Sequence, residues 1–360
     1  MVRKVGKVLH VVQSGDRGGV QRHVRDLALG LREETAGIVT GTGGWLTETL
    51  RAGGIEVRPA FDLQRSLNPR KIAAAREEVK RAAEDLLPAA VHAHGVFALL
   101  ASLPLAGKLP LVYTAHGFQW HDRAHPAWIR HLSWMLHRQS VTRVRVFVAI
   151  GSEADEARGL GFVRVEEIPN GVELGVEGTR EGNPNTFGVA TRLVAGKGLE
   201  DLPGVLYALP GSTLVVAGGG PYGARLVEEA ARLGVAGRVR LLGWQDDLTS
   251  FYDGITAYVS LSRKEGLPYA ALDALAAGLP VVLSDVPGHR ELVQGGRNGF
   301  LTRVGDPGAA AGALSRLFED EGLCRAAGRA SREIARERFA LSDMLLRHEA
   351  LYRELEGGSA

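Results

Sequence analysis

Two carboxylates, Glu265 and Asp273, have the residue type and spacing of side chains that bind a polar ligand from the edge of a helix. They lie eight positions apart, which is about two turns of helix, so both can border one cleft. Carboxylate oxygens accept hydrogen bonds, and such a pair suits the hydroxyl groups of a sugar. Acidic residues at this spacing also occur on solvated helix surfaces. The neighbouring residues are therefore needed to distinguish a ligand site from an ordinary surface.

The helix that carries Asp273 is predicted to begin at Pro268, because proline fixes φ near its helical value and loses nothing there by lacking an N–H. The backbone N–H groups of Tyr269 and Ala270 would then point out of the helix N-terminus, where the helix dipole favours an anion. Carboxylates beside an anion site suit a ligand that carries both hydroxyl and phosphate groups.

Other polar residues directly follow predicted strands. His116 stands in the tetrapeptide TAHG after the strand 109–114, and Arg192 and Lys197 follow the strand 186–191. In α/β proteins the carboxyl ends of parallel strands bind ligands. The alternatives are a histidine that only hydrogen-bonds its own loop and two ordinary surface cations.

Glycine-rich turns follow two further strands. The loop 14–19 has the spacing G-x-x-G-G and ends in Gly18 and Gly19. This spacing differs from the dinucleotide fingerprint G-x-G-x-x-G, so a hydride-transferring enzyme is disfavoured. Gly218 and Gly219 follow the strand 213–217, where glycine lets the backbone approach a ligand closely. Both loops also fit plain tight turns.

The elements that must position these residues alternate between apolar runs and amphipathic helices, which predicts two doubly wound α/β domains. The segment 170–185 is rich in Gly, Asn and charge, so it is the predicted boundary and would set the two sheets facing a cleft. The domains are then 1–170 and 171–340, followed by a helix in 341–360. Strands are expected at residues 5–12, 37–40, 90–93, 109–114, 146–150, 186–191, 213–217, 239–242, 256–261, 280–284 and 299–302.

Composition indicates an ordinary globular chain. With 360 residues, of which 45% are hydrophobic, it is long enough for two cores. The single cysteine, Cys324, excludes an intrachain disulfide or a thiolate metal cluster. No apolar run reaches the ~20 residues of a membrane span, and no signal-peptide pattern is seen, so a cytoplasmic location is expected.

Charge is distributed unevenly along the chain. Basic residues outnumber acidic ones in residues 1–170, and the reverse holds in residues 171–360. The first half therefore favours an anionic partner such as a lipid-linked glycan or a membrane surface. The basic residues lack the compact stripe and stacking aromatic residues of a nucleic-acid binder, so a nucleic-acid partner is not expected.

Together these motifs resemble the family-four (group 1) retaining glycosyltransferases, which use nucleotide sugars and have a signature of two Glu residues separated by seven others. Here Asp273 stands in place of the second Glu. The resemblance implies that Glu265 contacts the donor sugar and Asp273 the ribose of the nucleotide. It also implies that Arg192 and Lys197 hold the diphosphate, where fixed cations stabilise the charge growing on the leaving nucleotide. His116 would lie beside the transferred sugar.

The same resemblance assigns binding roles to further residues. Glu291 lies in the segment PGHRE, which is similar to a second turn of the family. Besides Asp273, the donor site is expected to include Gly18, Gly19, Gly218, Gly219, Leu242, Leu267, Tyr269 and Ala270. Candidates on the acceptor side are Arg17, His121 and Glu291.

The fold implied by the resemblance is GT-B, in which two Rossmann-like domains face a cleft and a C-terminal helix crosses back to the first domain. The first domain would bind the acceptor and the second the nucleotide sugar. Transfer would retain the anomeric configuration without a metal ion or another cofactor, and a UDP-sugar is favoured over a GDP-sugar as donor. The acceptor would be a glycan, a lipid-linked sugar or a small molecule, met at the inner face of the membrane.

Three alternatives remain open at this point. A nucleotide-sugar 2-epimerase shares the two-sheet architecture and would turn over donor without an acceptor. A non-catalytic nucleotide-sugar binding protein would fit the replacement of Glu by Asp273. Finally, the helix 126–138 places Trp128, Leu132 and Met135 on one face, which is typical of core packing but also of a helix that rests on a membrane surface.

Overall fold

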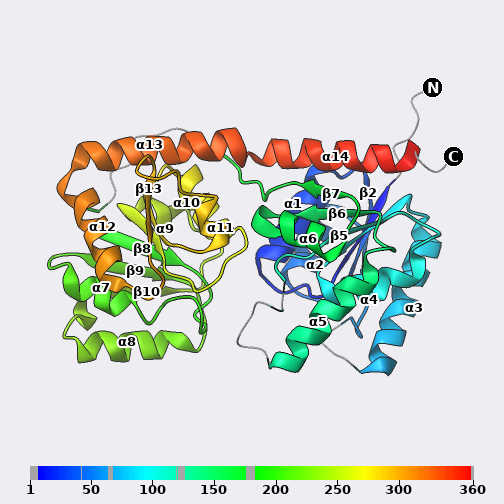
Figure 1. Ribbon diagram of the computed structural model, residues 1–360, viewed down its shortest axis with the longest axis horizontal. Helices are drawn as coiled ribbons and strands as arrows, with labels where there is room; N and C mark the ends of the chain where they lie inside the picture. Colours follow the sequence, from blue (N-terminus) through cyan, green and yellow to red (C-terminus); the bar gives the residue numbers. More distant parts are fainter. Residues whose placement is uncertain are drawn as a thin grey trace. The chain divides into compact units, whose positions relative to one another are not determined.

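The computed structural model describes residues 7–41, 43–63, 68–118, 120, 126–175 and 183–357. The chain divides into two compact units (Figure 1). Unit 1 comprises Met1–Asn170 with Leu341–Ala360, and unit 2 comprises Gly171–Ala340. Each unit is built on its own sheet of parallel strands, as the apolar runs of the sequence predict.

Unit 1 contains a seven-stranded sheet of order β3-β2-β1-β4-β5-β6-β7, in which all paired strands are parallel. The strand order reverses between β1 and β4, which is the position where doubly wound sheets bind ligands. The strands are β1 (Val8–Val12), β2 (Thr35–Thr40), β3 (Val57–Pro59), β4 (Ala90–His94), β5 (Leu111–Thr114), β6 (Val146–Ala149) and β7 (Val165–Glu167).

Two hydrophobic layers cover the sheet of unit 1. Leu9 and Val11 of β1 face a cluster that includes residues of α3, α4 and α6, whereas Val8 faces residues of α1 and α14. The alternation follows from the strand period of two. The helices are α1 (Gly19–Gly30), α2 (Trp45–Ala52), α3 (Pro69–Leu86), α4 (Val96–Ser102), α5 (Ala127–Ser140), α6 (Ala154–Leu160) and α14 (Leu341–Gly357).

Helix α14 completes the core of unit 1, although it follows unit 2 in the sequence. Its buried residues Met344, Leu351 and Tyr352 belong to the cluster that contains Val8 and Leu27. This confirms that the C-terminal helix packs on the first domain.

Unit 2 contains a six-stranded parallel sheet of order β10-β9-β8-β11-β12-β13, and its strand order reverses between β8 and β11. The strands are β8 (Thr186–Ala190), β9 (Thr213–Ala217), β10 (Val239–Gly243), β11 (Ala257–Ser260), β12 (Val281–Ser284) and β13 (Gly299–Thr302). The helices are α7 (Leu202–Ala208), α8 (Tyr222–Arg232), α9 (Thr249–Asp253), α10 (Tyr269–Ala276), α11 (Pro287–Arg290), α12 (Pro307–Glu319) and α13 (Glu321–Arg338).

The doubly wound α/β class is confirmed in both units, but two strands were missed. Both β3 and β7 have only three residues and lie at the edges of their sheet. Such short edge strands are half exposed and show no apolar run in the sequence.

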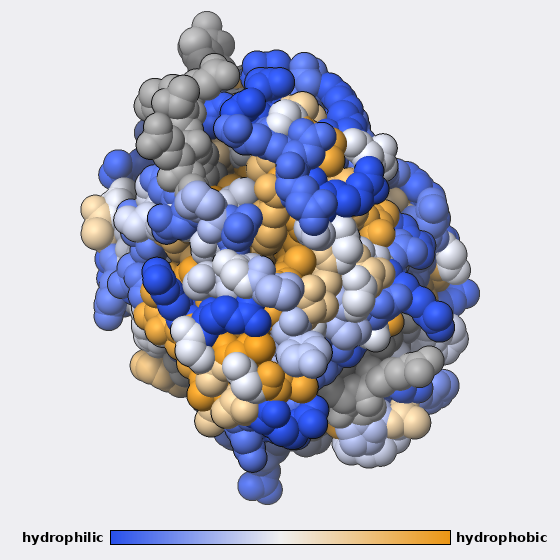
Figure 2. Space-filling model, turned by 90° about the vertical axis from the view of Figure 1, so that its left-hand side faces the viewer, coloured by the Kyte–Doolittle hydropathy of each residue, from blue (hydrophilic) through white to orange (hydrophobic). Residues whose placement is uncertain are grey.

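Apolar side chains are spread over the surface. The side of the molecule drawn in Figure 2 shows hydrophobic side chains between hydrophilic ones, as is usual for a globular protein. Within the described ranges, no helix is both long and apolar enough to cross a bilayer.

Candidate functional site

In unit 2 the loops that follow β8 and β11 are packed directly against each other. Gly198 has a φ of +67°, and a Cβ built there would lie 1.9 Å from the carbonyl oxygen of Leu261. The backbone N–H of Arg263 donates to the carbonyl of Gly196 over 2.9 Å. Only glycine fits this approach at position 198, so the two loops meet at the reversal of the strand order.

Arg263 clamps the same two loops through its side chain. Its guanidinium is 2.6 Å from a carboxylate oxygen of Asp201 and 2.8 Å from one of Glu200. Because both carboxylates bind one planar guanidinium, they hold the loop that contains Lys197 in one conformation. Arg263 therefore positions the site, a role that no local pattern in the sequence predicts.

The packed loops bring Lys197 and Glu265 into an ion pair. Lys197 Nζ lies 2.7 Å from Glu265 Oε1, and the two side chains are 21% and 12% exposed. Burial alone would raise the pKa of Glu265, but Lys197, His289 and a hydrogen bond from Ser262 together hold this pKa below its usual value. Glu265 is therefore a carboxylate at neutral pH, in the loop between β11 and α10.

Asp273 acts on the same buried group as Glu265. Helix α10 begins at Tyr269, one residue after the predicted start, because Pro268 is its N-cap and has an extended ψ of 124°. Burial raises the pKa of Tyr258, and the charges of Glu265 and Asp273 raise it further. Both acids thus lie near the Tyr258 hydroxyl, which itself donates to the carbonyl of Ala190 over 3.3 Å.

Arg192 follows β8 and is exposed. Its side chain forms no ion pair with any residue that the structure describes. It is thus a cation at the carboxyl edge of the sheet that can meet an anionic ligand.

The glycine turn after β9 also approaches the loop after β8. Gly218 has a φ of +139°, and a Cβ there would lie 1.8 Å from the carbonyl oxygen of Thr191. The carbonyl of Gly219 accepts from the N–H of Leu193 over 2.8 Å. Gly219 itself has open space where a side chain would be, so its backbone can be approached by a ligand. On the next strand, Leu242 is 41% exposed.

The turn that opens α11 packs beneath Glu265. The N–H of Gly288 donates to the carbonyl of Glu265 over 3.3 Å. His289 is fully buried, and its Nδ1 lies 3.0 Å from the carbonyl oxygen of Ser284. Glu291 is partly buried, and its carbonyl accepts from Arg338 over 2.9 Å. His289 influences Glu265 electrostatically, which sequence reasoning did not predict.

In unit 1 the predicted residue His116 lies in a strained turn after β5. Its φ is +56°, and that of Gly117 is +101°. A positive φ in a residue other than glycine is uncommon and is found most often at functional sites. The carboxylate of Glu153 holds the turn, because it accepts from the N–H of Gly117 and, over 3.3 Å, from that of Ile150.

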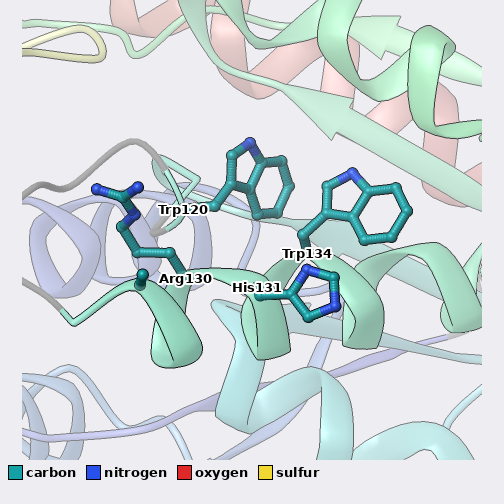
Figure 3. A pocket seen from close by; sticks show the side chains of 5 residues that line it. Trp120, Arg130, His131 and Trp134 are labelled. Carbon is teal, nitrogen blue, oxygen red and sulfur yellow. The ribbon is translucent and has the colours of Figure 1, made fainter.

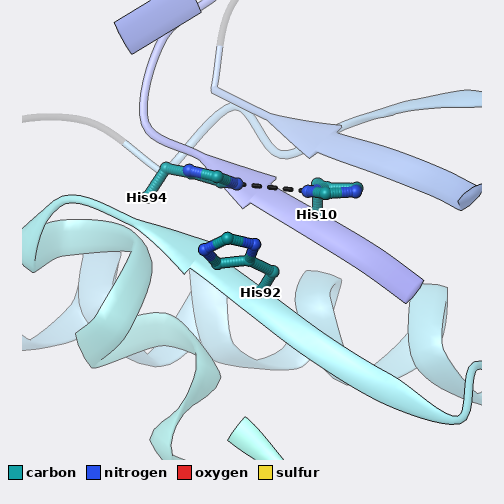
Figure 4. Close-up of side chains that lie close together, drawn as sticks. All are labelled: His10, His92 and His94. Atoms are coloured by element: carbon teal, nitrogen blue, oxygen red, sulfur yellow. Dashed lines mark hydrogen bonds between the residues drawn. The ribbon is translucent and has the colours of Figure 1, made fainter. Parts of the chain in front are cut away.

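Behind His116 lies a cluster of histidines from α1, β1, β4 and α14. His94 connects two of them, because its Nδ1 is 3.1 Å from His116 Nε2 and its Nε2 is 3.1 Å from His10 Nδ1. Figure 4 shows the bond from His94 to His10 beside the ring of His92. His92 is itself held between Tyr352 Oη and Thr114 Oγ1, each at 2.8 Å.

Burial keeps these imidazoles uncharged. It lowers the pKa of His10 and of His116 to about 3, with a smaller contribution from His348 in each case. The pKa values of His23, His92 and His94 are also lowered by burial and by their neighbouring imidazoles. The cluster is therefore neutral at physiological pH. Sequence reasoning identified only His116 among its members.

The glycine turn predicted at the start of unit 1 opens helix α1. Gly18 is the N-cap, Gly19 is the first helical residue, and Gln21 donates to the carbonyl of Ser14 over 3.0 Å. Arg17 is exposed and lies over the ring of Trp45 at 5.8 Å. The remaining acceptor-side candidate, His121, is outside the described residues.

A shallow hollow of about 260 Å³ lies beside helix α5. Figure 3 shows its side chains Trp120, Arg130, His131 and Trp134. The prediction of a core-facing stripe on this helix was wrong for Trp128, which is 62% exposed. The inward face carries Ser133, His137 and Ser140 instead, because His137 hydrogen-bonds the buried Tyr113 hydroxyl over 2.7 Å.

The predicted residues thus gather at two places. Unit 2 brings the following residues to the carboxyl edge of its sheet: Arg192, Lys197, Gly218, Gly219, Leu242, Glu265, Leu267, Tyr269, Ala270, Asp273 and Glu291. Unit 1 brings His116, Arg17, Gly18 and Gly19 to the corresponding edge of its own sheet.

Two family models match consecutive parts of the chain. The model described as glycosyltransferase family 4 matches residues 17–176, and the model described as glycosyl transferases group 1 matches residues 176–334. The two matches correspond to the two halves that carry the two candidate sites.

Curated relatives match shorter segments. The lipopolysaccharide core biosynthesis glycosyltransferase LpsE of Rhizobium meliloti is 35% identical over 132 residues, which are 37% of this chain and 39% of LpsE. The chain therefore spans only about two fifths of the length of this relative. A glycogen synthase of Mycobacterium tuberculosis is 28% identical over 268 residues, which are 68% of this chain and 64% of that enzyme.

Solved structures match almost the whole chain. A crystal structure of Anabaena Alr3699/HepE in complex with UDP has a TM-score of 0.83 at 21% identity, covering 97% of this chain and 100% of that one. A glycosyltransferase from Rickettsia africae has a TM-score of 0.80 at 19% identity, covering 98% and 99%. At these identities the likeness shows the fold.

Proposed function

Because this chain belongs to the group 1 glycosyltransferases with the GT-B fold, we propose that it transfers a sugar from a nucleotide-diphosphate sugar to an acceptor in the synthesis of a cell-envelope polysaccharide or glycolipid. The observation that carries this proposal is the pairing of Lys197 with Glu265 at 2.7 Å, at the reversal of the strand order in unit 2. A cation for phosphate and an acceptor for sugar hydroxyls then lie side by side.

The residues of unit 2 divide the donor between them. Arg192 and Lys197 bind the diphosphate, and they stabilise the negative charge that grows on the leaving nucleotide as the glycosidic bond breaks. Glu265, ionised in the folded protein, accepts hydrogen bonds from the sugar. Asp273 holds the ribose, and the open backbone at Gly219 lets the nucleotide approach closely.

The transfer itself retains the anomeric configuration. The acceptor hydroxyl attacks on the face from which the nucleotide leaves, and a donor phosphate oxygen takes its proton, so no glycosyl-enzyme forms. The fixed cations supply the charge stabilisation that a metal ion would give, and we propose that the reaction needs no metal. UDP is the favoured carrier, a preference supported by the UDP complex of the similar HepE protein.

We place the acceptor on unit 1, where His116 lies beside the transferred sugar. The surplus of basic residues in this half suits a lipid-linked or anionic glycan at the inner face of the membrane. Exposed Trp128 and Trp134 on α5, with Arg138 on the same helix, suit contact with lipid headgroups. Liposome flotation tests this contact, and flotation unchanged by Arg130→Glu with Arg138→Glu would argue against it.

Calorimetric titration tests the donor site. Metal-free protein is titrated with UDP and with GDP, and one of them should bind with micromolar affinity. Lys197→Ala should weaken this binding at least tenfold, whereas Lys80→Ala, which removes an exposed lysine of α3, should leave it unchanged. Absence of binding to both nucleotides would contradict the donor site as proposed.

Product analysis separates transfer from the two other functions. A 2-epimerase would convert the donor without an acceptor, and a binding protein would bind it without turnover. Asp273 in place of Glu favours the second of these. Release of UDP that depends on the added acceptor, with a new glycoside as product, supports transfer.

A further inference from the structure

Three histidine rings of unit 1 surround a common point. His23 of α1, His94 at the end of β4 and His116 after β5 have ring centroids 4.9, 5.4 and 5.6 Å apart. One nitrogen atom from each ring lies within 4.8 Å of the other two. The three ring centroids therefore form a nearly equilateral triangle, and one nitrogen atom of each ring lies toward its centre.

This triangle matches the dimensions of a tetrahedral metal site. Zinc binds histidine nitrogen at about 2.0–2.1 Å, so two ligands on one ion have nitrogens about 3.4 Å and ring centroids about 5.2 Å apart. The nitrogens of His94 and His116 that face each other are 3.1 Å apart. All three centroid separations fall within about 0.4 Å of the tetrahedral value.

The protonation of the rings leaves lone pairs at this point. His23 Nδ1 lies 3.0 Å from Asn170 Oδ1, an oxygen that can only accept, so the proton is on Nδ1 and Nε2 has a lone pair. This Nε2 is buried and has no hydrogen-bond partner among the described residues. His94 Nε2 can likewise donate to His10 Nδ1, so that its Nδ1 carries a lone pair that faces His116 Nε2. A histidine that binds metal usually donates its other N–H to such an acceptor.

A neighbouring group of three histidines fits a metal ion less well. His10, His92 and His94 also have nitrogens within 4.8 Å of one another. However, both nitrogens of His92 are already bonded, to Tyr352 and Thr114, and its ring centroid is only 4.0 Å from that of His94. A metal ion there would break both hydrogen bonds of His92, whereas in the first group it would replace only the bond between His94 and His116.

We propose that His23 Nε2, His94 Nδ1 and His116 Nε2 form a binding site for a zinc-class transition-metal ion, with a fourth position left for water or another ligand. The three imidazoles are neutral ligands, as such an ion requires. His116 is partly exposed whereas His23 and His94 are buried, so the ion reaches the site past His116. Because bound metal occupies His116 Nε2, Zn²⁺ inhibits the proposed sugar transfer, and removal of zinc restores it.

The test is a titration of protein without a histidine tag, after treatment with chelator. Co²⁺ replaces zinc and shows visible absorption when its coordination is tetrahedral. One equivalent of Co²⁺ should produce this absorption, and Zn²⁺ should abolish it. His23→Gln and His94→Gln should each weaken binding at least 100-fold, and Asn170→Ala should weaken it about 10- to 100-fold by releasing His23. His131→Gln, which removes an exposed histidine of α5, is the matched control.

A readout without variants keeps the test valid if a variant fails to fold. Zinc that binds only the folded protein raises its Tm in proportion to the logarithm of the free zinc concentration. No one-to-one Co²⁺ absorption together with no rise in Tm would overturn the proposal. Binding that persists in a folded His94→Gln variant would also overturn it. Since calorimetry with UDP does not involve these histidines, failure here leaves the proposed donor site standing.

Discussion

The two units place polar groups at the same edge of similar sheets, but unit 1 buries a cluster of neutral imidazoles there, whereas unit 2 buries an ion pair beside a single imidazole, His289. At the strand-order reversal, unit 1 has linked imidazoles, in which His94 lies 3.1 Å from both His10 and His116. Unit 2 has the ion pair of Lys197 with Glu265. Imidazole can be buried by giving up its proton, whereas an ionised carboxylate needs a partner to remain charged.

Of the two sites, the ion pair of unit 2 is the one that suits a charged ligand. An ion pair at 21% and 12% exposure can exchange its internal partner for phosphate and sugar hydroxyls. A neutral cluster offers lone pairs and single protons, which suit hydrogen bonds to an acceptor or a metal ion. The two units should therefore respond differently to acid.

Acid should unfold unit 1 before unit 2. The pKa is about 3 for His10 and about 4 for His137 and His348, against 6.5 when exposed. Between these values the unfolded chain binds protons that the folded unit cannot, so stability is full above pH 6.5 and falls as pH drops toward 4. A change of one in pKa corresponds to about 1.4 kcal/mol. The summed contribution of several such histidines is therefore comparable with the whole free energy of unfolding of a domain.

Hydrogen exchange followed by mass spectrometry measures the loss of stability with falling pH separately in each unit. Samples with chelator at several pH values should lose protection in peptides of β1, β4 and α14 first. Glu265 has a lowered pKa, so its contribution in unit 2 is lost only at pH values below the usual 4.5 of a glutamate. Simultaneous loss of protection in both units would break the comparison.

Glu265→Gln should remove most of the activity without unfolding unit 2. The change leaves Lys197 without its carboxylate and takes away the acceptor of the sugar hydroxyls, and we expect kcat to fall about 10²- to 10³-fold. The assay is release of nucleotide from the donor that calorimetry identifies. Glu200→Gln, which alters an exposed carboxylate paired with Arg263, should retain most of the activity. A similar loss in this variant would show that the conformation of the loop, rather than the Glu265 carboxylate, determines the activity.

Gly198→Ala should destabilise unit 2 by about 2–4 kcal/mol, because it combines a strained positive φ with overlap. The new Cβ would lie 1.9 Å from the carbonyl oxygen of Leu261. Gly196→Ala isolates the strain, since its φ is +85° and nothing lies within 4 Å of a Cβ there. Urea denaturation compares the variants, and equal losses would show that the overlap relaxes.

Tyr352→Phe should have the smallest effect, a loss of about 1–2 kcal/mol in unit 1. It removes the hydroxyl that lies 2.8 Å from His92 Nδ1 and leaves that buried nitrogen without its partner. Tyr207→Phe is the control, because Tyr207 is 62% exposed. If both variants denature at the same urea concentration, the hydrogen bond makes no net contribution.

Much of unit 2 could be predicted because its signals are local. The strand at Thr213–Ala217 and the helix that begins after Pro268 lie where apolar runs and proline place them. Glu265 and Lys197 each follow a predicted strand, and strand order then brings them together. The part played by Arg263 and His289 was not predictable, because it depends on contacts between loops that are remote in sequence.

The histidine cluster could not be predicted in the same way. His92 and His94 alternate along β4 as residues of one sheet face do, and this spacing is the only local signal. The identity of the covering helices, with His23 and His348, follows from tertiary packing. Glu153 similarly reaches the His116 turn from after β6, at a separation that no sequence period encodes.

The place of α14 has a consequence for the order of events during translation. The core of unit 1 needs Met344, Leu351 and Tyr352, so a nascent chain that has passed Asn170 still lacks one wall of its first hydrophobic core. At about 5–20 residues per second, the ribosome needs roughly 10 to 40 s more to supply that helix. Unit 2 is therefore complete before unit 1 on the ribosome. The apolar surface of α1 remains exposed until a chaperone or α14 covers it.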